Sequence, residues 1–576
     1  MTGQEQHKGA ASKQLEQLLA DDWEFTLREH PMFATSFGDH RFDDKLGRHA
    51  EADHERRHAK ERELLARLNA TDRSALAPNE QLNYDLFKRG AELGIEGFRF
   101  RTYRMPISKM GGFHSGFGEL PIQVPLRTTQ HYENYIARIR AFRQLTDDHI
   151  EVMRAGLRDG QVPPDVTLTN VGKTIEPHIV DDPEKSLLFK PFTEFPATVP
   201  EKNRSRLVEA GRNAIAECLV LAYKRFHEFV TTEYVPAARK EIAATALPDG
   251  EAYYAHCVRA FTSLDLTPQE IHETGLAEVK RIRAEMDAVI RDVKFDGDFK
   301  AFVQFLRTDE QFYAKTPDEL MKENAYVLKR MDGELPKLFG RLPRMPYGIR
   351  RVPDYTAPNT TTAYYWPAAG DGSRAGFYYI NTYDLKSRPL YEIEALALHE
   401  AVPGHHLQIA LQQELENLPN FRRFGGFTAF VEGWALYAER LGLESGFYTD
   451  PYRNFGRLTY EMWRSTRLVV DTGIHALGWT RQRAIDFMAD NTALTLLNIQ
   501  NEVDRYIAWP GQALAYKIGE IKVRELRRRA EQALGERFDV RAFHDELLGQ
   551  GGLPLDVLEP RIMGWIAEQK GRVSAR

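Results

Sequence analysis

Helical periodicity runs through most of this 576-residue chain and restricts its fold more than any other feature. Thr267-Pro-Gln-Glu270 forms a capping box with Pro at the first helical position, which marks the start of one predicted helix. Apolar residues recur at three- and four-residue spacing over residues 49–68, 203–230, 267–285, 389–402, 428–441, 455–477, 480–500 and 511–533. This pattern predicts a mainly α-helical protein.

One short segment has a different pattern. Residues 361–366 and 376–381 are rich in aromatic and β-branched residues, and the glycine-containing turn 369–372 separates them. These features predict a β-hairpin beside the helical core. We expect either that an edge of the hairpin pairs with an extended peptide, with its tyrosines lining the binding cleft, or that the hairpin only covers the core.

Composition and charge exclude several classes of protein. The chain has 77 Lys and Arg against 83 Asp and Glu, so its net charge of −6 argues against nucleic-acid binding. No apolar run approaches the ~18 residues of a membrane-spanning helix, so we expect no membrane partner. The first residues include no apolar leader, so we expect a cytoplasmic location, or a periplasmic or secreted one if a leader was removed. Cys218 and Cys257 are too far apart for a Cys-x-x-Cys zinc site.

The residues best suited to bind a metal lie near the end of an apolar helix. His399-Glu400 is followed by Pro403-Gly404-His405-His406, and Glu432 lies on a second apolar helix about 26 residues later. Two imidazoles and one carboxylate suit a single zinc ion with an open fourth position. Glu400, next to the first histidine, stands where metallopeptidases have the general base that deprotonates the attacking water.

The spacing of the two histidines departs from the His-Glu-x-x-His motif, because Pro403 occupies the place of the second ligand. In an unbroken helix His405 would lie about 240° round from His399. Pro403 and Gly404 allow the helix to bulge by two residues and return His405 to the site. His406 would face correctly in a straight helix but about 10.5 Å further along, so we favour His405. The simpler alternative is a histidine-rich helix end stabilised by the helix dipole.

Several segments resemble the bacterial domain-of-unknown-function family 885, which is grouped by its motif with the zincin-like metallopeptidases. They are ALHEAVPGHHLQ (397–408), VEGWALYAE (431–439), DTGIHALGWT (471–480), EVDRYIAWPGQALAYKIG (502–519) and TPQEIHETGLAEV (267–279). The resemblance implies that His399, His405 and Glu432 are metal ligands and that Glu400 is the base. It also implies a large helical zincin-like body, with a part at residues 1–290 covering a catalytic part at residues 291–576.

Amide hydrolysis also needs a donor directed at the developing oxyanion. Among His475, Arg505, Tyr506 and Tyr516, we expect Tyr516 to play this role and take His475 as the second candidate. Glu439 lies seven residues after Glu432 on the same helix face and is a candidate partner for a metal ligand.

Together these features predict zinc-dependent hydrolysis of peptide bonds in short peptides, as in an oligopeptidase or a carboxypeptidase. One alternative is a metal-dependent hydrolase that acts on a non-peptide amide or ester with the same residues. A second is a non-catalytic binding protein on the same fold, against which the intact Glu400 argues, since a binder has no need of a base.

Overall fold

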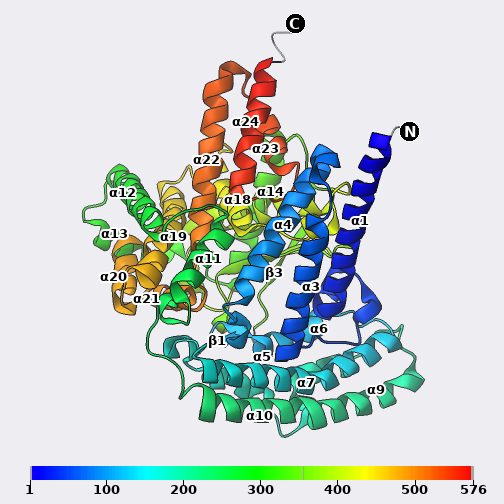
Figure 1. Ribbon diagram of the computed structural model, residues 1–576. Coiled ribbons are helices and arrows are strands. Elements are labelled where there is room, and N and C mark those ends of the chain that lie inside the picture. Colours follow the sequence, from blue (N-terminus) through cyan, green and yellow to red (C-terminus); the bar gives the residue numbers. More distant parts are fainter. Residues whose placement is uncertain (1–2, 355, 572–576) are drawn as a thin grey trace. The chain divides into compact units, whose positions relative to one another are not determined.

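The computed structural model describes residues 3–354 and 356–571, and helices make up most of them (Figure 1). The predicted mainly α fold is therefore confirmed. The chain forms two compact units, Met1–Tyr253 and Tyr254–Arg576, whereas the sequence analysis set the boundary near residue 290. The earlier boundary follows from helix α12 (Pro268–Asp292), which packs along α19 (Pro451–Ala476) within the second unit.

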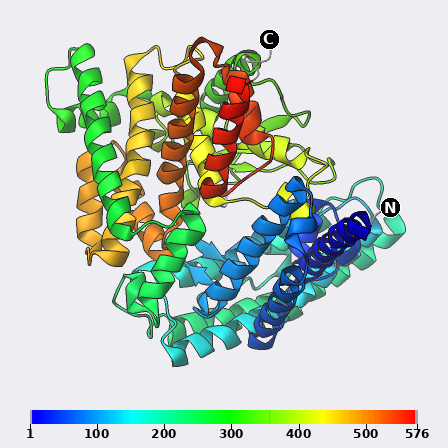
Figure 2. The ribbon, with the colours of Figure 1, turned by 45° about the horizontal axis from the view of Figure 1, so that its top comes forward.

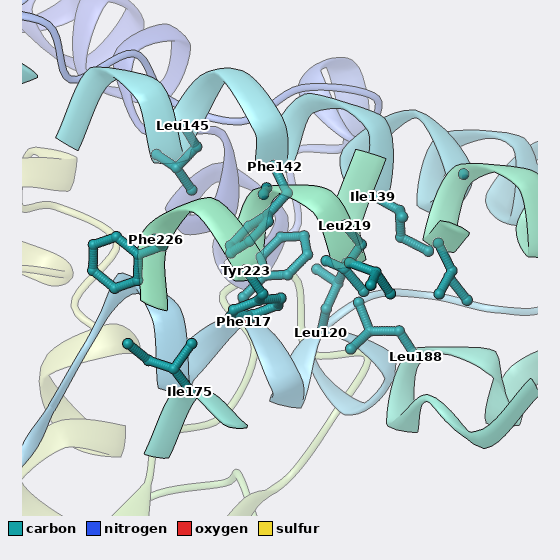
Figure 3. Packing of buried hydrophobic residues seen from close by; sticks show 14 of the residues in the cluster. Phe117, Leu120, Ile139, Phe142, Leu145, Ile175, Leu188, Leu219, Tyr223 and Phe226 are labelled. Atoms are coloured by element: carbon teal, nitrogen blue, oxygen red, sulfur yellow. The ribbon is translucent and has the colours of Figure 1, made fainter. Parts of the chain in front are cut away.

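Unit 1 is built from helices around its own apolar core. Its longer helices are α1 (Gly3–Glu29), α3 (Glu51–Asn69), α4 (Pro78–Phe98), α7 (Thr129–Asp159), α9 (Glu201–Ala214) and α10 (Leu221–Phe229), with a π-helical turn at Ile215–Val220 between the last two. In Figure 3, Ile139 and Phe142 of α7 point toward Leu219, Tyr223 and Phe226 from the π-turn and α10. The segment predicted as a helix at 203–230 is thus helical throughout, with the π-helical turn between α9 and α10.

Unit 2 contains every candidate site residue. Its remaining helices are α11 (Gly250–Thr262, which starts in unit 1), α13 (Phe299–Thr308), α14 (Pro317–Leu338), α15 (Ile393–Glu400), α16 (His405–Gln413), α17 (Asn420–Arg423), α18 (Thr428–Leu441), α20 (Arg481–Asn491), α21 (Leu496–Ala508), α22 (Ala515–Leu534), α23 (Val540–Leu548) and α24 (Leu555–Gly571). In Figure 2 the green α12, the gold α19, the orange α22 and the red α24 stand side by side.

The predicted hairpin is confirmed as β4 (Ala363–Trp366) and β5 (Gly376–Ile380), which pair antiparallel with Ala363 opposite Ile380. A third strand, β3 (Tyr347–Arg351), pairs parallel to β5 and makes the sheet order β3-β5-β4. Strand β3 was not predicted, because none of its side chains is fully buried and its Gly and Arg residues give no strand pattern.

Other helix boundaries test the periodicity directly. The prediction of a helix over residues 428–441 matches α18, and the capping box at Thr267 opens α12. The single helix predicted over 480–500 was wrong: α20 ends at Asn491, and Thr495 caps α21 through its side chain. No helix within the described residues is both long and apolar enough to cross a membrane.

Candidate metal centre

The candidate ligands come from three helices of unit 2. His399 is the last but one residue of α15, His405 is the first residue of α16, and Glu432 lies in the first turns of α18. The prediction of a two-residue bulge within one continuous helix was wrong: the first helix ends at Glu400, and a new helix begins at His405. Pro403 has no N–H to continue the first helix, which explains the full break.

Gly404 allows the chain to turn back closely onto α15. A Cβ atom placed on Gly404 would lie 1.9 Å from the carbonyl oxygen of His399 and 2.4 Å from that of Leu398. The amide of His406 donates to the carbonyl of Ala401 at 3.0 Å and closes the turn. Only a residue without a side chain fits here, so Gly404 determines where His405 begins the next helix.

The turn brings the three predicted ligands together. Glu432 Oε2 lies 3.7 Å from His399 Nε2 and 3.5 Å from His405 Nε2, and one ligand atom from each residue lies within 4.8 Å of the others. The two imidazole rings are 4.8 Å apart and nearly perpendicular, at 84°. Two nitrogens and one oxygen therefore converge on one point.

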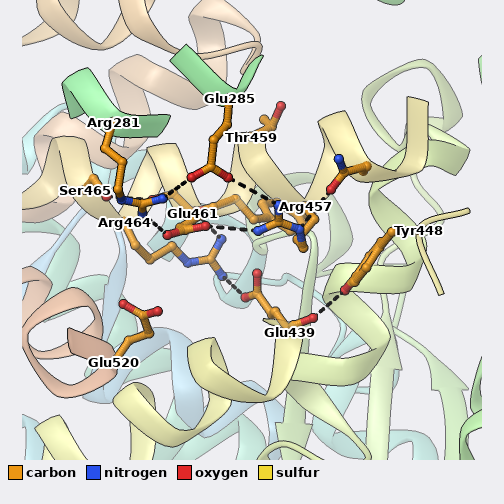
Figure 4. Close-up of polar contacts among 12 residues, drawn as sticks. Arg281, Glu285, Glu439, Tyr448, Arg457, Thr459, Glu461, Arg464, Ser465 and Glu520 are labelled. Carbon is orange, nitrogen blue, oxygen red and sulfur yellow. Dashed lines mark hydrogen bonds and ion pairs between the residues drawn. The ribbon is translucent and has the colours of Figure 1, made fainter. Parts of the chain in front are cut away.

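Glu439, the predicted partner, fixes the orientation of His399. His399 Nδ1 donates to Glu439 Oε1 at 2.8 Å, which leaves Nε2 facing Glu432. Figure 4 shows Arg464 of α19 directed at the same carboxylate, with Nη2 3.6 Å from Oε1, and the Tyr448 hydroxyl donating to the Glu439 backbone carbonyl at 2.7 Å. A carboxylate behind a ligand imidazole sets its tautomer and orientation.

The electrostatics of the cluster follow from burial and the facing charges. Burial alone would lower the pKa of His399, but Glu432 and Glu439 outweigh it and raise this pKa to about 9. Burial would raise the pKa of Glu432, yet the imidazoles of His399 and His405 hold it well below its usual value. The buried group thus favours a positive charge at the point where the three side chains meet.

The donor set fits a zinc ion. Glu432 Oε2 is buried and accepts no hydrogen bond from the described residues, although a buried carboxylate oxygen normally has a partner. Ligand atoms about 2.0–2.1 Å from a tetrahedral zinc lie about 3.3 Å from one another. The two separations that involve Glu432, 3.5 and 3.7 Å, are close to this value, and all three ligand atoms lie within 4.8 Å of one another, so the two imidazoles would move toward each other around a bound ion.

His406 has a different place. Its Nδ1 lies 2.9 Å from the Tyr365 hydroxyl of β4, and its Nε2 donates to the carbonyl of Met345 at 3.1 Å. Both ring nitrogens are therefore engaged with the region of the small sheet. The structure brings His405, and not His406, to His399 and Glu432.

Glu400 ends α15 next to the cluster. Its side chain is half-buried and makes no hydrogen bond with the described residues. Its charge reaches Tyr378 of β5: burial raises the pKa of that phenol well above its usual value, and the Glu400 charge raises it further. Glu400 therefore follows His399 directly and is close enough to β5 for its charge to act on Tyr378.

Tyr516 lies beside His399, as its predicted role requires. The two rings are nearly parallel, at 14°, with centroids 6.4 Å apart. Its helix, α22, comes very close to α18: a Cβ on Gly519 would lie 1.9 Å from the Ala429 carbonyl oxygen and 2.7 Å from the Gly433 Cα. The crossing of α18 and α22 at these glycines therefore fixes Tyr516 relative to Glu432.

His475, the second candidate, is placed differently. Its imidazole is fully buried near the end of α19, where Nε2 donates to the Tyr506 carbonyl at 3.0 Å and the ring packs on Tyr254 with centroids 5.2 Å apart. These contacts favour a packing role, so His475 does not enter the mechanism proposed below.

The buried arginines of α19 were not among the residues predicted from the sequence. Arg457, Arg464 and Arg467 are each at most 4 % exposed, and they lie among buried residues along this helix. Arginines at three- and seven-residue spacing within an otherwise apolar helix face were the signal available. A buried guanidinium requires a charged or hydrogen-bonded partner, so such residues mark a polar site inside the fold.

A family model described as "Bacterial protein of unknown function (DUF885)" matches residues 31–562. The chain is also similar to the crystal structure of a "putative lipoprotein" from Colwellia psychrerythraea, with 26% sequence identity and a TM-score of 0.90 over 97% of this chain and 99% of that chain. A "putative lipoprotein of unknown function" from Shewanella oneidensis has the same fold, with 18% identity and a TM-score of 0.67 over 95% and 99% of the two chains. No curated protein matches.

Proposed function

The chain belongs to the DUF885 family of bacterial proteins of unknown function, and we propose from the geometry of its site that it is a zinc-dependent hydrolase of peptide bonds in short peptides. One observation carries the proposal. His399, His405 and Glu432 bring two imidazole nitrogens and a buried carboxylate oxygen, which accepts no hydrogen bond from the described residues, within 4.8 Å of one another, and Glu400 directly follows His399 in α15.

In this proposal His399, His405 and Glu432 hold the zinc, and Glu439 holds His399 in the correct tautomer. Bound there, the ion would polarise the scissile carbonyl and make water a better nucleophile at neutral pH. Peptide hydrolysis adds the hydroxyl of water to the carbonyl carbon and a proton to the leaving nitrogen. Glu400 accepts the proton from the attacking water and passes it to that nitrogen, so its carboxylate is unchanged at the end.

Tyr516 is suited to stabilise the negative charge that develops on the carbonyl oxygen. Its hydroxyl oxygen lies 3.3 Å from both Arg505 Nη2 and Gln512 Nε2, and both nitrogens donate to it. The phenolic proton then remains available for an acceptor outside the protein. A donor fixed in position before the reaction stabilises the transition state without reorganisation.

Metal analysis of the purified protein, paired with a mixed library of short peptides before and after chelation, tests the proposal. We expect about one zinc per chain, cleavage that chelation abolishes, and recovery when zinc is returned. If the protein hydrolyses non-peptide amides or esters but no peptide, these compounds replace short peptides as the proposed substrate class. A protein that binds zinc tightly but turns over none of these substrates would overturn the enzymatic proposal.

The cytoplasmic location expected from the sequence stays a prediction, since the two solved structures named above are each described as a "putative lipoprotein". Fractionation of cells that express the full gene product decides it. Recovery with the soluble cytoplasmic fraction supports the prediction, and recovery with the envelope contradicts it.

A further inference from the structure

A second charged group lies beside Tyr516, and the mechanism above leaves most of it unexplained. It consists of Arg467 on α19 with Glu502 and Arg505 on α21, and we call it the arginine cluster. The Arg467 guanidinium lies over the Tyr516 ring, 4.4 Å from its centroid. The arginine cluster therefore adjoins the same tyrosine that lies beside His399.

Arg467 is almost fully buried, at 2 % exposure, but only part of its guanidinium has partners. Its Nε donates to the Tyr506 hydroxyl and its Nη2 to Glu502 Oε2, each at 3.0 Å. Its Nη1 is buried and makes no hydrogen bond with the described residues, although Trp463 and Tyr516 offer their ring faces. One edge of a buried cation thus lacks an acceptor.

Arg505 is the more accessible member of the cluster, with 21% of its side chain exposed. Its Nη2 donates to Gln512 Oε1 at 2.8 Å and to the Tyr516 hydroxyl at 3.3 Å, which are both uncharged. Its Nη1 reaches Glu502 Oε1 only at 3.6 Å. Arg505 therefore contacts both the Tyr516 hydroxyl and Glu502, the carboxylate that also pairs with the buried Arg467.

The charges of the arginine cluster do not balance. Two guanidiniums share one carboxylate, Glu502, whose Oε2 also accepts from the Tyr506 hydroxyl at 2.9 Å. An unpaired charge in a protein interior is costly, and a guanidinium is well shaped to bind a carboxylate through two parallel hydrogen bonds. The surplus positive charge and the unpaired Nη1 both call for a negatively charged ligand.

We propose that the arginine cluster binds the C-terminal carboxylate of the peptide substrate, so that the protein removes short fragments from free C-termini. This rests on the proposed peptidase function and names the substrate class of the same site. The ring centroids of His399 and Tyr516 are 6.4 Å apart, and the Arg467 guanidinium carbon lies 4.4 Å from the Tyr516 centroid. Because an extended residue spans about 3.3–3.6 Å, the scissile bond lies at most about three residues from the C-terminus.

A matched pair of short peptides tests the substrate class with the zinc-loaded full chain. The two peptides share one sequence and differ only in a C-terminal carboxylate or amide. We expect kcat/KM to be at least about tenfold higher for the free acid, because a charge-assisted pair is lost in the amide. Acetylation of the N-terminus is the control and leaves the rate unchanged. Cleavage of acid and amide at equal rates overturns the inference while the peptidase proposal stands.

Variants of Arg505 assign the preference to the cluster. Arg505→Gln should reduce the ratio of acid to amide cleavage to about one, and Arg505→Lys should restore part of it, because lysine keeps the charge without the planar fork. The exposed Arg528, which pairs only weakly with Gln532, gives the control Arg528→Gln, whose ratio is unchanged. A ratio that survives in Arg505→Gln contradicts the assignment. The ratio is used because Arg505 also contacts Tyr516, which affects both peptides alike.

Binding without turnover separates this inference from the peptidase proposal. Calorimetry with the metal-free full chain and the same peptide pair measures the affinity alone. At least tenfold tighter binding of the acid, lost in Arg505→Gln, supports the carboxylate site even if no peptide is ever cleaved. Equal binding of acid and amide, together with equal cleavage or none, shows that the arginines only stabilise the fold through their ring and Glu502 contacts.

Discussion

His405 and His406 are adjacent in sequence, yet their imidazoles have different surroundings. His405 Nε2 faces Glu432 at 3.5 Å, whereas His406 contacts Tyr365 and the Met345 carbonyl. Adjacent residues on a helix point about 100° apart, so the first turn of α16 can present only one of them to His399. At the scale of single residues, the direction of each imidazole therefore decides which histidine joins the cluster, and the number of histidines in the segment does not.

The two histidines give a direct test. His405→Ala should remove one of three ligands and reduce bound zinc to a small fraction of one per chain. His406→Ala should keep its zinc, although loss of its two hydrogen bonds should lower the melting temperature. Metal analysis after dialysis and thermal unfolding measure both effects. Zinc that stays in His405→Ala but is lost from His406→Ala would reverse the ligand assignment.

At the scale of elements, the break between α15 and α16 determines the site. The first helix ends with His399 and Glu400, the second starts with His405, and Gly404 lies against the His399 carbonyl between them. Strand β5 carries Tyr378, which the Glu400 charge reaches, and α22 carries Tyr516, whose ring lies beside His399.

Gly404→Ala should disturb the site without touching a ligand. The new Cβ would overlap a backbone oxygen, so the turn must shift, and we expect a loss of about 1–3 kcal/mol in unfolding free energy and at least tenfold weaker zinc binding. Gly564→Ala in α24 is the control, because nothing lies within 4 Å of its Cβ and alanine favours a helix. A Gly404→Ala protein with normal zinc affinity would show that the close turn does not position His405.

Asp471 of α19 joins two other segments of unit 2, and its contribution to folding stability depends on pH. Its carboxylate accepts from the Tyr254 hydroxyl at 2.7 Å and from the Gly511 amide, and burial raises its pKa to about 7 despite these bonds. Between about pH 4 and pH 7 the unfolded chain releases this proton while the folded chain keeps it, so the stability contribution falls as pH rises.

Asp471→Asn should therefore gain about 2–3 kcal/mol of stability relative to the unsubstituted protein between pH 5 and pH 8, because this range covers only part of the shift in pKa to about 7. Urea unfolding at these two pH values measures the change, with the exposed Asp556→Asn of α24 as the control. An equal difference at both pH values would show that Asp471 does not keep its proton in the folded protein.

Features that repeat along one helix could be predicted from the sequence, and features that depend on contacts between distant helices could not. Apolar periodicity located α18 and α12, because their buried faces repeat with the helix. That His399, His405, Glu432 and Glu439 lie close together was predictable, because imidazoles and carboxylates at this spacing suit one metal site. The full break at Pro403 and the roles of Arg464 and Arg467 were not, because they depend on contacts between helices distant in sequence.

At the scale of the whole molecule, unit 2 holds the candidate site and unit 1 has a separate core. All the candidate ligands, Glu400 and Tyr516 lie between residues 399 and 516. The placement of the predicted N-terminal part over a cleft stays a prediction, and substrate length is its consequence: an enclosed site admits short peptides and excludes long chains.

A length series tests this consequence. Peptides of about 5 to 30 residues with the same C-terminal sequence should be cleaved more slowly as they lengthen, and a denatured long chain should resist. Chromatography and mass spectrometry of the products measure the rates. Efficient digestion of the denatured chain would show that the site is open.

The most direct test of the proposed chemistry is the turnover of a short peptide by zinc-loaded Glu400→Gln. Glutamine keeps the shape and hydrogen bonding of the side chain but cannot accept the proton, so the variant should keep its zinc and melting temperature and lose at least ~10²-fold in kcat. Glu416→Gln, at an exposed position, is the control and keeps full activity. Near-normal turnover by Glu400→Gln would contradict the mechanism, and loss of zinc with turnover would make Glu400 a ligand.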